Sequence, residues 1–486
     1  MLKNSFQLDP SPIEFGTDGW RGVLGADITL ERVLKVASAS AQELVFRAAP
    51  NQKSRTVIIG YDRRFLARQF AEAIASSVRG CELEPLLANC PVTTPACSLA
   101  VTRHNALGAL VVTASHNPPE WLGIKIKGPW GGSVGADFTE SVEKRLFLDA
   151  YSKPINGVTK TFNPREEHLA DLSKKFDISY LANTLKNMGL KVFVDPMHGS
   201  AANCLKDLFG EHAEDLIQEI RTEQDAYFGG NPPEPLAKYI SQLISLIKTR
   251  NAEGKSSLGI VFDGDGDRIA AVDERGNFSS TQFIMPLMID HLARVRGMPG
   301  KVIKTVSGSD LMTLVAKESK RQVSELPVGF KYIASEMLSQ DVLIGGEESG
   351  GVGFGCHLPE RDALFSALLL LEIIAEQEKN LGVRLDQLRN TFGASFYDRI
   401  DLRLSGMDKR QKLESMLREN PPAMIEGKLV EDIVTIDGFK FRLGLNNWVM
   451  FRFSGTEPLL RIYSEASSKE ELENYLFWAK RFVEVI

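Results

Sequence analysis

Short apolar runs that each end in a polar or glycine-rich loop recur along this chain, and they restrict its fold more than any other feature. Helical patterns lie between these runs. In residues 30–45, apolar side chains at positions 30, 33, 34, 37, 41, 44 and 45 form one stripe. Strands that alternate with helices are typical of α/β proteins. We therefore predict strands at residues 57–59, 109–112, 192–194, 258–262, 302–306 and 342–344.

The length of the chain indicates several domains. A chain of 486 residues exceeds what one hydrophobic core usually supports, so three or four domains are expected. The pattern changes near the end, where a strand at 459–463 precedes a helix that Ser468 and Glu471 open with the spacing of a capping box. This change indicates a smaller α+β domain. Polar stretches between the periodic segments predict domains at 1–175, 176–297, 298–393 and 394–486.

The composition argues against several classes of function. A net charge of −6 leaves no basic footprint for nucleic acid, so local Arg and Lys must meet any anionic substrate. No stretch approaches the ~20 apolar residues of a membrane span, and the first residues lack the apolar core of a signal peptide. We expect a cytoplasmic protein that binds neither nucleic acid nor membrane. Its 5 cysteines lack metal-ligand spacing, which favours reduced thiols over disulfides.

A hydroxyl group follows the predicted 109–112 strand in a turn that no core requires. Ser115 lies in residues 113–119 (TASHNPP), where Asn-Pro-Pro prevents continuation of a helix or strand. The serine is therefore expected to be exposed on a sharp loop at the carboxyl end of a strand, where open α/β sheets bind ligands. Taken alone, such a segment is more often an ordinary hydroxyl-rich turn.

Three carboxylates follow the predicted 258–262 strand, and they favour a catalytic role for Ser115 over an ordinary turn. Asp263, Asp265 and Asp267 alternate with glycines and can converge on one cation, whose charge offsets their repulsion. A small number of carboxylates, with positions left for water or a phosphate oxygen, favours Mg²⁺. The segment nearly fits an EF-hand with Glu274 at its last position. However, Arg268 stands where that loop needs glycine, and a strand is predicted to enter it.

These two loops resemble the phosphoserine and metal loops of the α-D-phosphohexomutase superfamily, which includes phosphoglucomutases and phosphomannomutases. The resemblance spans nearly the whole chain and includes residues 16–22 (GTDGWRG), 345–351 (GGEESGG) and 452–458 (RFSGTEP). It implies an α/β fold with three similar mixed α/β sandwich domains plus a C-terminal α+β domain around one central cleft. Gly351 stands where many phosphomannomutase-type members carry a histidine, which argues against a dual mannose and glucose role.

The resemblance also implies a role for each motif. Ser115 would carry a phosphoryl group, and Mg²⁺ would be held against an oxygen of that phosphate. The implied catalytic residues are Ser115, His116, Lys125, Arg21 and Arg268. The implied metal ligands are Ser115, Asp263, Asp265 and Asp267. The implied substrate-binding residues are Glu347, Ser349, Arg452, Ser454, Gly455, Thr456, Arg461 and Lys331.

The resemblance implies that Lys125 acts as the base that exchanges a proton with the sugar hydroxyl, and that His116 assists. A buried lysine near other cations has its pKa pulled toward neutrality, which would suit a general base. From the residues alone, Lys125 is equally a strand lysine whose ammonium group reaches solvent.

The implied function is a phosphoglucomutase-type mutase that interconverts glucose 1-phosphate and glucose 6-phosphate through a phosphoserine enzyme and a 1,6-bisphosphate intermediate. The alternatives are a hexose 1,6-bisphosphate synthase, whose serine a bisphosphate donor recharges, a phosphomannomutase, and a sugar-phosphate sensor without turnover. A sensor would need no nucleophile with its own metal. The expected cofactors are one Mg²⁺ per active site and a hexose 1,6-bisphosphate activator. The expected partner is a phosphorylated hexose, and the chain is expected to be a monomer or a homodimer.

Overall fold

The computed structural model describes residues 11–453 and 458–485, and the chain divides into two compact units. Unit 1 comprises Met1–Ser280, Gly329–Asp341 and Ser349–Leu381. Unit 2 comprises Thr281–Val328, Val342–Glu348 and Gly382–Ile486. Each unit therefore combines segments that are distant in the sequence.

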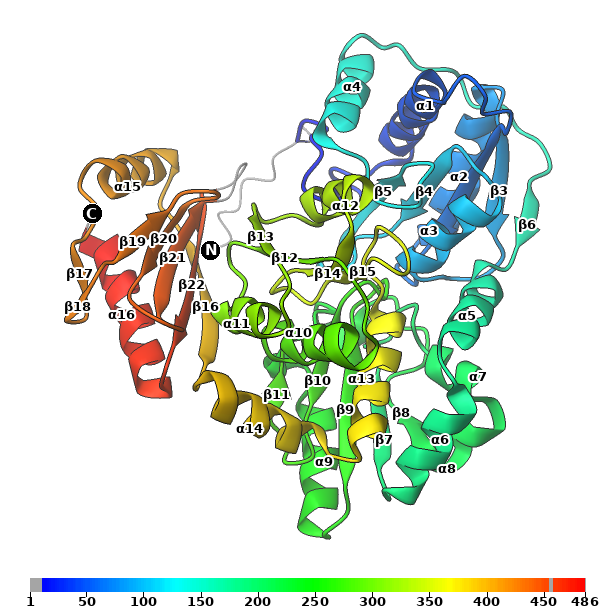
Figure 1. Cartoon of the computed structure of the whole chain (residues 1–486). Coiled ribbons are helices and arrows are strands. Elements are labelled where there is room, and N and C mark those ends of the chain that lie inside the picture. Colours follow the sequence, from blue (N-terminus) through cyan, green and yellow to red (C-terminus); the bar gives the residue numbers. More distant parts are fainter. Residues whose placement is uncertain (1–10, 454–457, 486) are drawn as a thin grey trace, which may run out of the picture. The chain divides into compact units, whose positions relative to one another are not determined.

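The first sheet of unit 1 carries the loop of Ser115. Its elements are β1 Trp20–Val23, α1 Leu30–Phe46, β2 Thr56–Tyr61, α2 Ala67–Gly80, β3 Glu84–Ala88, α3 Thr94–Arg103, β4 Gly108–Val112, β5 Trp121–Lys127, α4 Ala136–Phe147 and β6 Lys160–Phe162. The strand order is β1-β5-β4-β2-β3-β6. The strands β2, β3, β4 and β6 run parallel, and β5 is antiparallel to β1 and β4. Helices α1 and α2 lie side by side, and α3 packs on β2 and β4 (Figure 1).

Helix α1 shows how the predicted stripe becomes a buried face. Thr29 caps its N-terminus by accepting the N–H of Arg32 through its side chain. Val33, on the buried face, is 1% exposed. The prediction is wrong at both ends of the stripe, because Leu30 and Val45 are 53% and 37% exposed. Both lie in the terminal turns of the helix, where fewer neighbouring elements cover a side chain.

The second sheet of unit 1 carries the loop of Asp263. Its elements are α5 Pro164–Lys175, α6 Ile178–Asn187, β7 Lys191–Asp195, α7 Cys204–Phe209, α8 Ala213–Leu216, β8 Ile217–Glu219, α9 Ser241–Ala252, β9 Ser257–Phe262, β10 Ile269–Val272 and β11 Phe278–Ser279. Its strand order is β11-β10-β9-β7-β8, with β7, β8 and β9 parallel and β10 antiparallel to β9 and β11. Unit 1 also contains α12 Phe330–Ser339, β15 Val352–Phe354 and α13 Ala363–Gln377. Helix α13 packs against β10 and α6.

Unit 2 contains a parallel set of strands with its own helices. These elements are α10 Thr281–Asp290, β12 Lys301–Thr305, α11 Asp310–Glu318, β13 Val323–Leu326 and β14 Val342–Gly346. The strands β13 and β14 pair with β12 in parallel, one on each side. Helix α14, Leu381–Phe392, leads to the C-terminal part of the unit.

The C-terminal part of unit 2 has an antiparallel sheet and its own core. Its elements are β16 Phe396–Arg403, α15 Met407–Glu419, β17 Met424–Ile425, β18 Lys428–Leu429, β19 Asp432–Val434, β20 Phe439–Arg442, β21 Trp448–Phe453, β22 Leu459–Ala466 and α16 Lys469–Val485. The strand order is β16-β22-β21-β20-β19, and Phe441, Val449 and Ile462 belong to the core. Ser468 accepts the N–H of Glu471 at 3.1 Å, so the predicted cap is confirmed. The antiparallel sheet with helices α15 and α16 confirms the predicted α+β character.

Five of the six apolar runs predicted as strands lie wholly within β2, β4, β7, β9 and β14, and the sixth, 302–306, lies in β12 except for Val306, which follows the strand. The predicted α/β character is thus confirmed. The five cysteines are free thiols, as expected.

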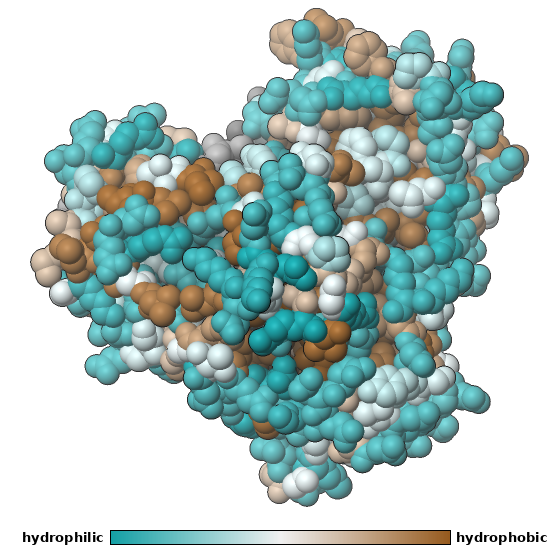
Figure 2. Space-filling model, in the orientation of Figure 1, coloured by the Kyte–Doolittle hydropathy of each residue, from teal (hydrophilic) through white to brown (hydrophobic). Residues whose placement is uncertain are grey.

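Hydrophilic side chains cover much of the visible face (Figure 2). Among the described residues, no helix combines the length and the apolar character of a membrane span.

Candidate active site

The turn after β4 buries the predicted nucleophile. Ser115 is 1% exposed, and its φ of 52° is a left-handed conformation that is unfavourable for residues other than glycine. Its Oγ donates a hydrogen bond to Oδ2 of Asp263 at 2.7 Å. The expectation of an exposed serine is wrong because the loop that carries Asp263 packs against this turn.

The loop between β9 and β10 holds the three predicted carboxylates at the end of a strand. Oδ1 of Asp263 accepts the N–H groups of Asp267 at 3.0 Å and Arg268 at 3.1 Å, which curls the loop around this side chain. A Cβ added to Gly264 would lie 2.5 Å from the carbonyl oxygen of Ser115, so the close approach of the two loops requires glycine. Strand β9 enters this loop, which argues against an EF-hand as expected.

The carboxylate cluster fits a divalent cation. Asp263, Asp265 and Asp267 each offer one oxygen, and these oxygens lie within 4.8 Å of one another. Burial and the neighbouring Asp267 and Asp265 raise the pKa of Asp263 well above its usual range, which reflects their mutual repulsion. Among the described residues, Oδ1 of Asp265 and Oδ1 of Asp267 are buried without a hydrogen-bond partner. A hard cation such as Mg²⁺ would satisfy these oxygens and offset the repulsion.

Lys125, on β5, lies inside the same cluster. Its Nζ is 2.8 Å from carboxylate oxygens of Asp18 and Asp265 and 2.6 Å from one of Asp267. Burial acts to lower the pKa of Lys125, but these carboxylates together outweigh burial and raise it. The prediction of a pKa near neutrality is wrong, because anions rather than cations dominate the surroundings of this lysine. The alternative of a solvent-reaching ammonium group is also wrong, because the side chain is fully buried.

Asp18 and Arg361 complete the cluster, although neither was predicted as a site residue. Arg361 pairs with Asp18 and lies 2.8 Å from Oδ2 of Asp267. Its neighbour Glu360 pairs with Lys127 at 2.5 Å. Asp18 stands within a recognised motif, but Arg361 lies in no motif. The only signal in the sequence was the charged run of residues 360–362 just before an apolar helix.

Arg21 and His116 lie at the serine loop. Arg21 donates to Oδ1 of Asn117 at 2.9 Å, two residues beyond Ser115. Burial, together with the nearby cations led by Arg268, lowers the pKa of His116 well below its usual range. His116 is therefore neutral, and its Nδ1 is buried without a hydrogen-bond partner in the described part of the chain.

The glycine-rich segment around Ser349 adjoins the metal loop within unit 1. Arg268 forms an isolated β-bridge with Gly351, and the N–H of Ile269 donates to the carbonyl of Gly350 at 3.0 Å. A Cβ added to Gly351 would lie 2.2 Å from Cδ of Arg361. The place where the resemblance leads one to expect a histidine is thus taken by the side chain of Arg361.

Three further predicted substrate-binding residues, Arg452, Arg461 and Glu347, lie in unit 2. Arg452 on β21 and Arg461 on β22 are directly opposite each other in the antiparallel pair. Nε of Arg452 also lies 2.8 Å from Oδ2 of Asp437. Glu347 is buried, and its carbonyl accepts the hydroxyl of Thr281 at 2.8 Å. The predicted Ser454, Gly455 and Thr456 lie outside the described residues.

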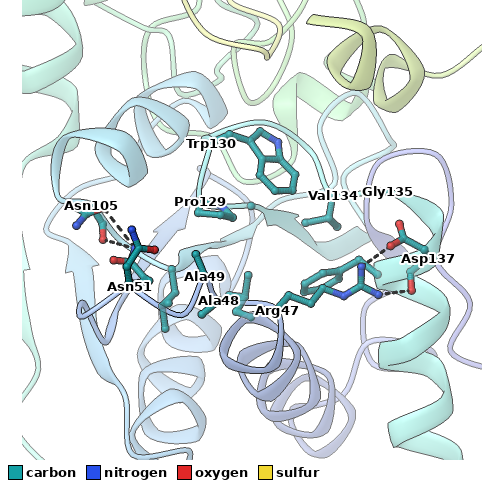
Figure 3. A pocket seen from close by; sticks show the side chains of 15 residues that line it. Arg47, Ala48, Ala49, Asn51, Asn105, Pro129, Trp130, Val134, Gly135 and Asp137 are labelled. Atoms are coloured by element: carbon teal, nitrogen blue, oxygen red, sulfur yellow. Dashed lines mark hydrogen bonds and ion pairs between the residues drawn. The ribbon is translucent and has the colours of Figure 1, made fainter. Parts of the chain in front are cut away.

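Unit 1 contains a small notch and a larger cavity that differ in their relation to the predicted site. Lys331, at the start of α12, lines a small notch together with Asp18. A cavity of about 390 Å³ lies between the C-terminal end of α1 and the turn after β5, with Trp130 on one side and the Arg47–Asp137 ion pair on another (Figure 3). None of the predicted site residues lines this second cavity.

Comparisons with known proteins agree with this arrangement. Four domain models of the phosphoglucomutase/phosphomannomutase family match the chain in order. The alpha/beta/alpha domains I, II and III match residues 12–152, 166–276 and 280–392, and the C-terminal domain matches residues 408–476. The predicted fold class of three α/β domains and a different C-terminal domain is thereby confirmed.

Relatives match along nearly the full length. A phosphoglucomutase/phosphomannomutase of Thermococcus kodakarensis is 29% identical, over 95% of this chain and 96% of its own. A phosphoglucosamine mutase of Limosilactobacillus reuteri is 28% identical with the same coverage. The crystal structure of a candidate phosphomannomutase from Thermus thermophilus superimposes with a TM-score of 0.84 and 32% identity, covering 98% of this chain and 100% of that one.

The buried serine at a carboxylate cluster, the four matching domains and the full-length relatives lead to one conclusion. The chain belongs to the α-D-phosphohexomutase superfamily and is an intramolecular phosphotransferase.

Proposed function

We propose that this enzyme interconverts glucose 1-phosphate and glucose 6-phosphate through phospho-Ser115 and a glucose 1,6-bisphosphate intermediate. The contact of 2.7 Å between Oγ of Ser115 and the carboxylate of Asp263 carries the proposal. A serine hydroxyl can hold and transfer a phosphoryl group only where charge is neutralised and the groups are in line. A buried serine beside three carboxylates that fit a cation meets the first of these needs.

The residues around Ser115 take separate roles in this proposal. Mg²⁺ held by Asp263, Asp265 and Asp267 would neutralise charge on the transferring phosphoryl group. Arg21 and Arg268 stabilise the same group by direct contact, and we add Arg361 to this set because it shares the cluster. Lys125 exchanges the proton of the sugar hydroxyl: as the ammonium group that its carboxylate neighbours favour, it returns a proton to the sugar oxygen that loses the phosphoryl group. The neutral His116 assists as proton acceptor when the hydroxyl attacks.

The groups that hold the sugar are assigned from the family motifs. Glu347 and Ser349 read ring hydroxyls, whereas the distal phosphate is gripped by Arg452, Ser454, Gly455, Thr456, Arg461 and Lys331. The opposed side chains of Arg452 and Arg461 support a bidentate grip on phosphate. Holding one phosphate while the other end reacts turns binding energy into orientation. We also propose the domain division at residues 175, 297 and 393, and hexose 1,6-bisphosphate as activator.

Phosphorus NMR of three substrates tests the substrate choice. Glucose 1-phosphate, mannose 1-phosphate and glucosamine 1-phosphate are each incubated with enzyme and Mg²⁺, with and without a trace of glucose 1,6-bisphosphate. The proposal expects the glucose substrate to convert fastest and the bisphosphate to stay at trace level. Faster conversion of either other sugar would contradict the glucose assignment, and accumulating bisphosphate would identify a synthase.

The carrier role of Ser115 is tested by one substitution. Intact-protein mass spectrometry should detect one bound phosphate on the wild-type enzyme. Ser115→Ala should lack this phosphate and should have no turnover. Ser173→Ala is the matched control, because Ser173 is an exposed helix serine whose hydroxyl donates to the carbonyl of Ala170. Full turnover by Ser115→Ala would disprove the phosphoserine mechanism.

A further inference from the structure

A buried arginine lies beneath the serine loop. The guanidinium of Arg64 donates to four main-chain carbonyls of this loop: those of Ser115, Asn117 and Pro118 at 2.7 Å each, and that of Trp121 at 3.1 Å. Nη1 and Nη2 of Arg64 each donate two of these hydrogen bonds. The side chain of Arg64 is only 1% exposed. The loop therefore turns its carbonyls inward onto one planar group rather than toward solvent.

The N–H of Ser115 is held by a second set of buried side chains. Thr113 Oγ1 accepts the N–H of Ser115 at 2.8 Å and donates its own proton to Oδ2 of Asp62 at 2.6 Å. Asp62 also lies 3.2 Å from Nε of Arg64 and accepts the main-chain N–H of Arg64 at 3.0 Å. Arg64 and the Asp62–Thr113 pair thus fix both main-chain polar groups of Ser115.

Small rotations of this backbone would change where the hydroxyl points. The loop has little room to move, since a Cβ on Gly264 would already meet the carbonyl oxygen of Ser115 at 2.5 Å. The guanidinium of Arg64 also lies 4.9 Å from the ring centroid of Phe228, a cation–π contact that restricts its plane. The left-handed conformation of Ser115 is kept only while its surroundings impose it.

We propose that Arg64 is a positioning residue for phosphoryl transfer, which acts with Asp62 and Thr113 through the backbone of Ser115 to aim the phosphate-carrying oxygen. This inference rests on the proposed carrier role of Ser115. Arg64 does not touch substrate. It sets the in-line geometry that transfer requires, and misplacement of a reacting group by about 1 Å can lower a rate about 100-fold.

Substitution of Arg64 by Ala and by Lys tests the proposal. At a temperature where circular dichroism shows both variants folded, we expect kcat to fall by about 100-fold in Arg64→Ala while KM stays near wild type. Lys should restore little, because a point charge cannot serve four carbonyls in one plane. Millimolar guanidinium chloride should recover part of the activity of Arg64→Ala, an effect that a general loss of stability would not produce.

Two controls separate the outcomes. Arg63→Ala removes the neighbouring arginine, which donates to the carbonyl of Thr222 instead of the serine loop, and should keep wild-type kcat. Thr113→Val removes only the hydroxyl that holds the N–H of Ser115, and it decides the question if Arg64→Ala does not fold. Wild-type kcat in Thr113→Val or in a folded Arg64→Ala would overturn the positioning role. Turnover by Ser115→Ala would instead overturn the proposed mechanism, whatever the arginine does.

Discussion

Lys125 occupies the position in which it neutralises the same carboxylates that fit a cation. Its Nζ lies 2.8 Å from Asp265 and 2.6 Å from Asp267, so the lysine and the cation compete for negative charge. We predict that Lys125→Met loses turnover but binds Mn²⁺ more tightly, by about tenfold or about 1.4 kcal/mol, because two carboxylates lose their counter-ion. Isothermal titration calorimetry measures this affinity.

The neighbouring Lys127 provides the control for this experiment. It pairs with Glu360 and lies 3.5 Å from Asp18, away from the metal carboxylates. Lys127→Met should therefore leave the Mn²⁺ affinity close to that of the wild type. Weaker Mn²⁺ binding by Lys125→Met would show that the lysine supports the metal site rather than competing with it.

Asp62 gives a pH dependence with a defined sign. Burial, only partly offset by Arg64 and by Thr113, raises the pKa of Asp62 from 3.8 to about 6. Between these values the folded protein retains a proton that the unfolded chain has lost, so this carboxyl lowers stability as the pH rises. The full difference corresponds to about 3 kcal/mol. Urea unfolding measures the free energy of unfolding of the wild type and of Asp62→Asn. The value for the wild type minus the value for Asp62→Asn should fall as the pH rises from 4 to 6. A difference that rises with pH would contradict this assignment.

Helix α13 depends on one carboxylate at its N-terminus. Oδ1 of Asp362 accepts the N–H groups of Leu364 and Phe365, while Oδ2 lies 2.7 Å from Nε2 of His168 and 2.8 Å from Nε2 of His357. One side chain therefore caps the helix and joins two buried histidines. Because Arg361 directly precedes this cap, the start of α13 also sets where that guanidinium enters the carboxylate cluster.

Removal of this cap should cost more than removal of an ordinary one. We predict that Asp362→Ala lowers the free energy of unfolding by about 3 kcal/mol or more, because the cap is lost and two buried imidazoles lose their acceptor. Thr29→Ala, at the cap of α1, should cost about 1 kcal/mol. Urea denaturation compares the two variants, and equal losses would show that the histidine contacts contribute nothing.

For the whole molecule, the proposed cation site lies within one of the two units. The metal carboxylates belong to unit 1, whereas Arg452 and Arg461 belong to unit 2. A ligand that binds only the folded state stabilises it, by about 2.7 kcal/mol at 100 times its Kd. Mg²⁺ should therefore slow hydrogen exchange in the β9–β10 loop and its neighbours in unit 1, and leave peptides of unit 2 unchanged.

Hydrogen–deuterium exchange with mass spectrometry measures this pattern with and without Mg²⁺. The control is the triple variant in which Asp263, Asp265 and Asp267 are replaced by Asn, which should show no Mg²⁺ effect. Equal protection in this variant would place the cation elsewhere in the molecule.

Patterns among neighbouring residues in the sequence were enough to predict the strands that precede Ser115 and Asp263 and the loops that hold these two residues. The strands before Ser115 and Asp263 follow from apolar runs that end in residues unable to continue them. The cap at Ser468 follows from its spacing to Glu471. Such features depend on neighbours within a few positions. The sugar preference, the domain boundaries and the oligomeric state stay predictions.

Only the tertiary structure decided the environment of those residues. The burial of Ser115, the raised pKa of Lys125 and the entry of Arg361 into the cluster all depend on groups that are distant in the sequence. In the sequence, Arg64 is one residue of a polar loop after a strand, and nothing there indicates its partners. Only the fold shows that it donates to four main-chain carbonyls of the serine loop. Burial and pKa are set by what lies within a few ångströms, and folding alone brings such partners together.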